Sequence, residues 1–201
     1  RGGVVLSTAE FGEYMDKGCP MVLGGPLGHV MAAKAVAFTE ANRPEFKAYA
    51  AKIVENAQAL AKACIDEGMS VVSGGTDNHL MLIDVTTLGI TGRQGASALR
   101  DCGITINKNA IPFDQNSPMI TSGLRLGTPA VTTLGMGVSE MKEIAAIIKL
   151  ALSNTKPGVV ESGTNAGKPS KINYVLDDAA QKSARARVKT LLDRFPVYPQ
   201  L

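Results

Sequence analysis

Arg125 is the residue whose type and surroundings point most directly to chemistry. It lies in a short apolar segment, predicted as a strand, between Gly123 and Gly127. A cation in such a segment requires a fixed anionic partner, because an unpaired buried charge is costly. A guanidinium group holds a carboxylate through two parallel hydrogen bonds. The partner is therefore either the carboxylate of a ligand or an Asp or Glu of the chain, and the pattern favours neither.

The loop over 107–121 precedes Arg125 and is the second candidate. It carries hydrogen-bond donors and acceptors at 107–109 and at 114–117. Loops of this length in compact domains are often functional, and this one could bind a polar heterocycle. Simple solvation of a polar loop is the more common outcome.

A third candidate is Gly24-Gly25-Pro26, which comes just before a predicted helix. Glycines let the backbone approach a ligand closely, and helix N-termini attract anions. A plain tight turn is the more frequent explanation of such a motif.

The elements that must position these residues are mixed helices and strands, which predicts an α/β module behind a helical lead-in. A capping-box pattern at 7–10 predicts the start of a short first helix. Further helices are predicted over about 27–41, 43–67, 92–101, 139–152 and 174–194, and strands over about 4–6, 70–73, 80–85, 104–106 and 123–127. Residues 153–170 are polar and rich in glycine, so we expect a surface insertion there.

Composition excludes several classes of function. The 201 residues include 21 Lys and Arg and 18 Asp and Glu, for a net charge of +3. This charge is too small and too evenly spread to indicate nucleic acid or an anionic membrane as a partner. Hydrophobic residues make up 45% of the chain, which allows a core, but no apolar run approaches the roughly 20 residues of a membrane span.

The three cysteines, Cys19, Cys64 and Cys102, are far apart and form no CxxC motif. With only two histidines in addition, neither a disulfide framework nor a metal site is expected. The cysteine content favours a reducing, cytoplasmic location.

The motifs resemble serine hydroxymethyltransferase, a pyridoxal-phosphate (PLP) enzyme family of the aspartate-aminotransferase fold. The matching segments are Arg1-Gly2-Gly3, Gly24-Gly25-Pro26-Leu27-Gly28-His29-Val30, Ala32-Ala33-Lys34-Ala35-Val36-Ala37, Val71-Val72-Ser73-Gly74-Gly75-Thr76-Asp77-Asn78-His79-Leu80, Asn107-Lys108-Asn109 with Pro112, Ser117-Pro118, Thr121-Ser122-Gly123-Leu124-Arg125-Leu126-Gly127-Thr128-Pro129-Ala130, and Arg194-Phe195-Pro196-Val197-Tyr198.

This resemblance implies a domain organisation. Residues 1–48 would be the C-terminal end of the PLP-binding large domain, and residues 49–201 the small C-terminal α/β domain, with a small sheet packed by helices. The chain begins with Arg1 rather than Met. In the family, Arg-Gly-Gly follows the lysine that holds PLP as a Schiff base, so we expect that lysine upstream and no catalytic residue within this chain.

The resemblance also implies roles for individual residues. Arg125 would bind the carboxylate of serine or glycine, and Gly24 and Gly25 would place a backbone N–H on the PLP phosphate of a neighbouring subunit. Asn109 and Ser117 would contact the pterin of the co-substrate tetrahydrofolate. A homodimer or homotetramer with shared active sites is implied as well.

Three departures from the family pattern leave alternatives open. Residues 19–23 replace the usual Phe-Pro-Gly-x-Gln, residues 133–136 replace Thr-Arg-Gly-Phe, and 153–170 is longer than in short bacterial members. The alternatives are a related α-methylserine hydroxymethyltransferase, a threonine-type aldolase, and a small-domain fragment without catalytic activity.

Overall fold

The computed structural model describes residues 2–19 and 21–197. Arg1 and Tyr198, which belong to two of the matching segments, lie outside the described residues. The chain divides into two compact units, Arg1–Ala50 and Ala51–Leu201, and helix α3 (Pro44–Asp66) contributes to both. This division falls two residues after the predicted boundary, and the assignment of the first part to a larger domain stays a prediction.

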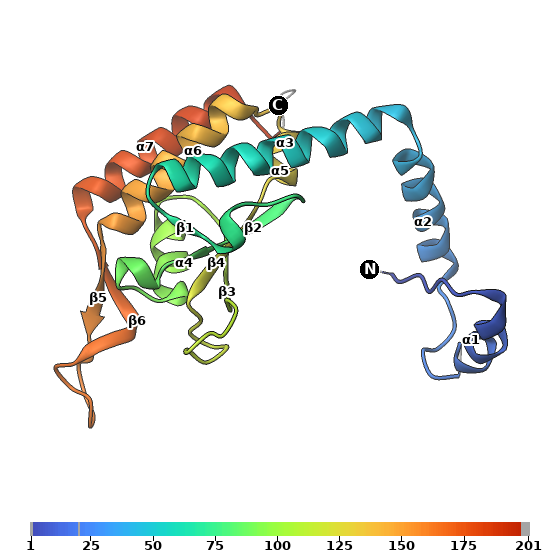
Figure 1. Ribbon diagram of the computed structural model, residues 1–201, viewed down its shortest axis with the longest axis horizontal. Coiled ribbons are helices and arrows are strands. Elements are labelled where there is room, and N and C mark those ends of the chain that lie inside the picture. The colour runs from blue at the N-terminus through green and yellow to red at the C-terminus, as the bar shows by residue number, and fades with distance from the viewer. Residues whose placement is uncertain (1, 20, 198–201) are drawn as a thin grey trace. The chain divides into compact units, whose positions relative to one another are not determined.

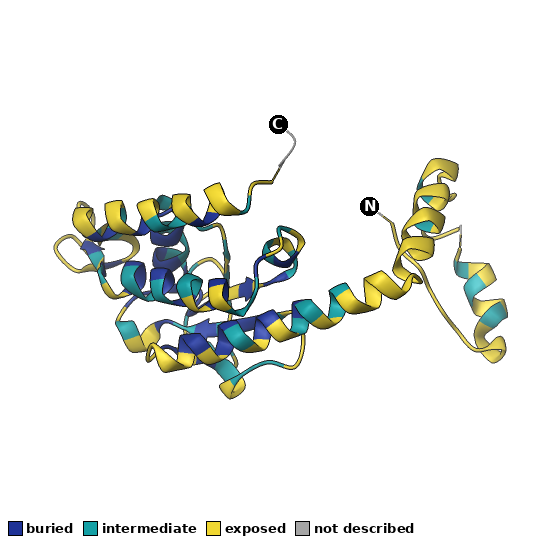
Figure 2. Cartoon of the chain, turned by 90° about the horizontal axis from the view of Figure 1, so that it is seen from above, coloured by how far each residue is buried: buried dark blue, intermediate teal, exposed yellow. Residues whose placement is uncertain are grey.

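The first unit contains a 3-10 turn and two helices, η1 (Ala9–Phe11), α1 (Gly12–Gly18) and α2 (Gly28–Ala41). None of the residues in these elements is buried, and Figure 2 shows them exposed almost throughout. The predicted strand at 4–6 is wrong, because this exposed segment has no neighbouring strand with which to pair. The described part of this unit therefore presents apolar side chains without enclosing a core.

The second unit is built around an antiparallel sheet with the strand order β1-β2-β4-β3 (Figure 1). Its strands are β1 (Ser70–Val71), β2 (Leu80–Asp84), β3 (Asn107–Asn109) and β4 (Gly123–Gly127). Burial alternates along the two central strands, as expected when one face of a sheet covers a core. Met81, Ile83, Leu124 and Leu126 are buried on the core side.

Helices complete this core on one side of the sheet. They are α3, α4 (Gly92–Asp101), α5 (Pro129–Thr133), α6 (Val138–Ser153) and α7 (Asp178–Arg194). Leu99 of α4 and Ile147, Ile148 and Leu152 of α6 are fully buried in the same cluster as the sheet residues. The α/β prediction for this part of the chain is thus confirmed.

The types or bounds of several other elements differ from the prediction. The strand predicted at 104–106 lies three residues later, at β3. The expected insertion at 153–170 contains most of a hairpin, formed by β5 (Thr155–Val159) and β6 (Pro169–Leu176), and α7 consequently begins at Asp178 instead of 174. The strand predicted at 70–73 ends at Val71, because a short 3-10 turn, η2 (Val72–Gly74), follows it. A second 3-10 turn, η3 (Thr86–Leu88), follows β2.

The hairpin forms because it docks on the start of α4. The Gln94 side chain is fully buried, and its Nε2 donates hydrogen bonds to the carbonyl oxygens of Ser170 and Asn173, both at 2.7 Å. Thr91 Oγ1 donates to the carbonyl oxygen of Lys171 at 2.9 Å. Because these partners lie 76 to 80 residues apart in the sequence, the contacts that stabilise the hairpin cannot be predicted from a local pattern.

Candidate functional site

Arg125 lies in the middle of β4, where it is paired with Leu82 of β2 and with Asn107 of β3. Its side chain is exposed and lies on the face of the sheet opposite the core, because its neighbours Leu124 and Leu126 point into the core. Among the described residues, none forms an ion pair or a hydrogen bond with its guanidinium group. Within this part of the chain the ion pair left open by the sequence is not formed, so the cation is available to a ligand.

A cavity of about 500 Å³ adjoins this position. The sheet side contributes His79, Asn107 and Arg125 to its lining, and α3 and α6 contribute Leu60, Ile144 and Ile148. The apolar wall from α3 and α6 belongs to the core side of the sheet, whereas the Arg125 guanidinium group lies on the other face.

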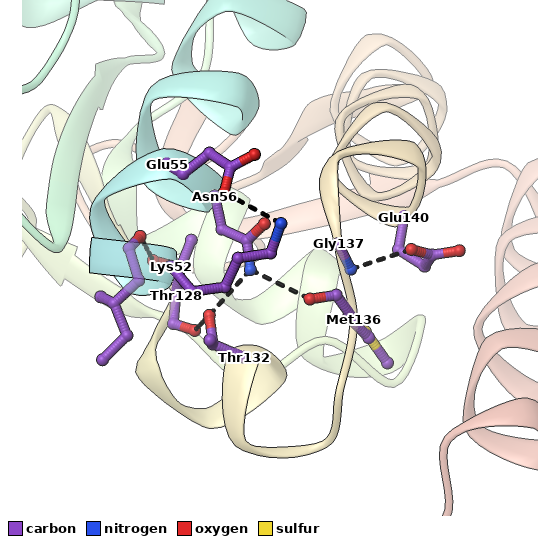
Figure 3. A network of polar contacts seen from close by, with 9 residues as sticks. Lys52, Glu55, Asn56, Thr128, Thr132, Met136, Gly137 and Glu140 are labelled. Carbon is purple, nitrogen blue, oxygen red and sulfur yellow. Dashed lines mark hydrogen bonds and ion pairs between the residues drawn. The ribbon is translucent and has the colours of Figure 1, made fainter. Parts of the chain in front are cut away.

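The end of β4 is fixed by a network of buried polar groups (Figure 3). Thr128, one residue after the strand, donates from Oγ1 to the carbonyl oxygen of Ile53 in α3 at 2.8 Å. Asn56, one turn further along α3, donates from Nδ2 to Thr132 Oγ1 at 2.9 Å and to the Met136 carbonyl oxygen at 3.0 Å. These bonds hold α5, and with it the end of the strand that carries the arginine, against α3.

Replacing Asn56 by alanine is expected to lower the free energy of unfolding by about 2–3 kcal/mol, because buried acceptors lose their donor. Urea denaturation of the chain measures this change. Lys52→Ala, one turn earlier in α3, is the control, since it removes an exposed pair with Glu55 that contributes about 0–1 kcal/mol. Equal effects of the two substitutions would contradict the role given to the network.

The candidate folate residues lie at the two ends of one segment of the second unit. Asn109 is the last residue of β3 and pairs with Gly123, and its Nδ2 donates to the Ala110 carbonyl oxygen at 2.7 Å. Ser117 is exposed, and its carbonyl oxygen accepts hydrogen bonds from the backbone N–H groups of Ile120 and Thr121, both at 2.9 Å. The loop over residues 110–121, which follows Asn109 and contains Ser117, is therefore ordered by internal hydrogen bonds.

Gly24 and Gly25 lie in the first unit, in the loop that precedes α2. Gly24 adopts a φ of +78°, a conformation that favours glycine, and no atom lies within 4 Å of a Cβ placed on either residue. Both residues line an open cavity of about 800 Å³, together with residues that include Gly2, Val30 and Lys34. The backbone of this loop is thus open to a ligand.

The family model described as serine hydroxymethyltransferase matches residues 8–148. The chain belongs to the serine hydroxymethyltransferase family. Curated serine hydroxymethyltransferases of Treponema pallidum, Salinispora tropica and Mycolicibacterium smegmatis are 53%, 53% and 50% identical to it over 201 residues, which is all of this chain. The chain spans 34%, 41% and 39% of the lengths of these relatives, respectively.

Membership of the serine hydroxymethyltransferase family agrees with the mixed α/β fold of the second unit. No helix in the described part of the chain is long and apolar enough to cross a membrane.

The sequence shows Asp114 only as one of several polar residues at 114–117. In the structure, its carboxylate is the main hydrogen-bond acceptor of the loop over 110–121. Partial burial alone would raise the pKa of this carboxyl group. The hydrogen bonds that Ser122, Asn116 and Ile111 donate to it outweigh that effect and lower its pKa below the ordinary value of 3.8. The residue is therefore an anion at neutral pH. Its importance is visible only in its four hydrogen bonds, three of which come from backbone N–H groups.

Proposed function

We propose that this chain is the C-terminal part of a serine hydroxymethyltransferase, which converts serine and tetrahydrofolate to glycine and methylenetetrahydrofolate with PLP as cofactor. The observation that carries this proposal is the Arg125 guanidinium group, which is exposed on β4 without a partner among the described residues. Family membership supports the reaction class, and the exposed guanidinium group of Arg125 supports binding of the substrate carboxylate on β4.

Arg125 would hold the carboxylate of serine through two parallel hydrogen bonds. Such a clamp fixes the orientation of the substrate and so lowers the entropic part of the barrier. PLP, when bound, supplies an electron sink for the charge that is left when the hydroxymethyl carbon departs. The open sheet face and the rigid end of β4 are what this chain contributes to positioning.

Gly24 and Gly25 would direct a backbone N–H to the PLP phosphate of a neighbouring subunit. Their fit to this role rests on the positive φ of Gly24 and on the open space around both residues, which leave the backbone accessible. This role requires a homodimer or homotetramer with shared active sites. The Schiff-base lysine is expected outside the 201 residues, and we expect the enzyme to be cytoplasmic.

Asn109 and Ser117 would contact the pterin of tetrahydrofolate. An amide and a hydroxyl group can match the alternating donors and acceptors on the edge of a heterocycle. Asn109 is half-buried and immediately precedes the ordered loop over 110–121, and Ser117 is exposed within that loop.

The full-length protein, purified with PLP, tests the function. We expect tetrahydrofolate-dependent release of glycine from serine. Activity only toward α-methylserine, or only aldol cleavage of threonine without folate, would overturn the proposal in favour of a related enzyme. The 201-residue chain alone is expected to be inactive, because it lacks the proposed Schiff-base lysine.

Replacing Asn109 and Ser117 together by alanine is expected to raise the KM for tetrahydrofolate by about tenfold or more, since each lost hydrogen bond to a neutral group contributes about 0.5–1.5 kcal/mol. Steady-state kinetics with varied folate and saturating serine measures this value. An unchanged KM would show that the pterin binds elsewhere. Gln115→Ala, in the same exposed loop, is the control.

A further inference from the structure

Asp114 organises the loop over residues 110–121 through both of its carboxylate oxygens. Oδ1 accepts hydrogen bonds from the Asn116 backbone N–H at 2.8 Å and from Ser122 Oγ at 2.5 Å. Oδ2 accepts from the backbone N–H groups of Ile111 at 3.2 Å and Ser122 at 2.9 Å. One side chain thus ties together the start, middle and end of the loop.

This arrangement requires a carboxylate and not merely a polar group of similar shape. Each oxygen of Asp114 faces two donors. An asparagine has one acceptor oxygen, so in either orientation its NH₂ group would face a pair of donors. The Asp114→Asn substitution therefore changes the hydrogen bonding of the loop while almost preserving its volume.

A second set of contacts fastens the loop to the β5–β6 hairpin. Lys171 of β6 donates from Nζ to Asn116 Oδ1 at 2.9 Å, and Asn116 Nδ2 donates to Ser122 Oγ at 2.9 Å. The backbone of Lys171 is itself held by Thr91, the N-cap of α4. The hairpin overlaps the segment that the sequence predicts as a surface insertion. Through Lys171 it contacts the loop that carries Ser117.

Ser117 is constrained on both sides by these contacts. The residue before it, Asn116, is hydrogen-bonded to Asp114 and Lys171. The carbonyl oxygen of Ser117 accepts hydrogen bonds from the backbone N–H groups of Ile120 and Thr121. Its hydroxyl group remains on the surface. A loop held in this way keeps its conformation before a ligand arrives, which reduces the ordering cost of binding.

We propose that Asp114 is a positioning residue for folate, and that Lys171 assists it from the hairpin, by holding the loop in the conformation that presents Ser117 to the pterin. This inference rests on the proposed function and adds a determinant that does not itself touch the ligand. The amino-acid subsite at Arg125 lies in the middle of β4, and no hydrogen bond of Asp114 reaches that residue.

Full-length Asp114→Asn enzyme with PLP tests this inference by two activities. The KM for tetrahydrofolate in the serine reaction is expected to rise about tenfold. Folate-free cleavage of threonine, which needs the amino-acid subsite and PLP but no folate, is expected to keep its kcat and KM within about twofold of the wild type. Glu161→Gln removes an exposed carboxylate from the turn of the hairpin and is expected to change neither activity.

The outcomes separate the inference from the function on which it rests. A wild-type enzyme without folate-dependent activity contradicts the proposed function. A wild-type enzyme with that activity, combined with an unchanged folate KM in Asp114→Asn, overturns the inference alone. A parallel loss of both activities also overturns it, since that pattern indicates a general structural role.

Two milder variants keep the test decisive if Asp114→Asn does not fold. Ser122→Ala removes one of the four hydrogen bonds to the carboxylate, and Lys171→Met removes the contact from the hairpin. Each is expected to raise the folate KM about threefold with unchanged folate-free cleavage. A folate KM equal to that of the wild type in both would overturn the proposal.

Discussion

Replacing Arg125 by alanine in the full-length enzyme is expected to lower kcat/KM for serine by about 10²–10³-fold. Removing one partner of a hydrogen-bonded charge pair typically costs about 2–5 kcal/mol, and each 1.4 kcal/mol is a factor of ten. The effect should be large here because no described residue of the chain pairs with Arg125, so its guanidinium group is free to bind the substrate carboxylate. Steady-state kinetics with varied serine and saturating folate measures the change.

Two further arginine variants sharpen this result. Arg125→Lys keeps the charge but loses the bidentate geometry, so we expect an intermediate loss. Arg185→Ala removes an exposed arginine from α7 and is expected to leave kcat/KM unchanged. If Arg125→Ala retained the wild-type affinity for serine, the assignment of the carboxylate site would be wrong.

Replacing Gly92 by alanine is expected to destabilise the fold by about 3 kcal/mol or more, the upper range for overpacking. Gly92 is the buried first residue of α4, and its N–H donates to the Thr121 carbonyl oxygen at 2.9 Å. A Cβ at this position would lie 2.5 Å from the Gly123 carbonyl oxygen and would overlap Thr121 Oγ1. Because the Gly123 carbonyl oxygen is a backbone atom of β4, relief of the clash requires β4 to move.

Gly12→Ala is the matched control for this substitution. Gly12 is also the first residue of a helix, α1, but no atom lies within 4 Å of the position that a Cβ would take there, so the change is expected to be neutral or slightly stabilising. Denaturant unfolding of both variants gives the comparison. Similar midpoints for Gly92→Ala and the wild type would show that α4 can move away from β4 at little cost.

Helices α3 and α4 were predictable because their signals are local, whereas the capping-box pattern at 7–10 was misleading, since Thr8, the N-cap of η1, makes no side-chain hydrogen bond. The capping box of Thr91 and Gln94 starts α4 at the predicted residue, and the apolar spacing of α3 places its buried face correctly. The β5–β6 hairpin was not predictable, because its stabilising contacts come from α4, far away in the sequence. Segment 4–6 shows the converse, since its β-branched residues favour a strand but find no partner.

The site was predictable only in part, for a related reason. Arg125 stood out because a lone cation between glycines is unusual in a strand. Whether an acidic side chain of the chain would neutralise it depended on the tertiary structure, and the described residues provide no such partner. Asp114 could not be singled out, because its importance arises from backbone donors that a sequence pattern does not display.

The contacts of the hairpin have a consequence for how the protein is made. Ser170, Lys171 and Asn173 leave the ribosome more than 70 residues after Gln94, and the 110–121 loop emerges between them. Contacts of such long sequence separation form late, after the loop-closure entropy has been overcome. During synthesis, the loop that would bind folate therefore lacks its contact with Lys171 until β6 has been translated. Until then α4 also exposes the polar side chain of Gln94, which is buried in the folded chain.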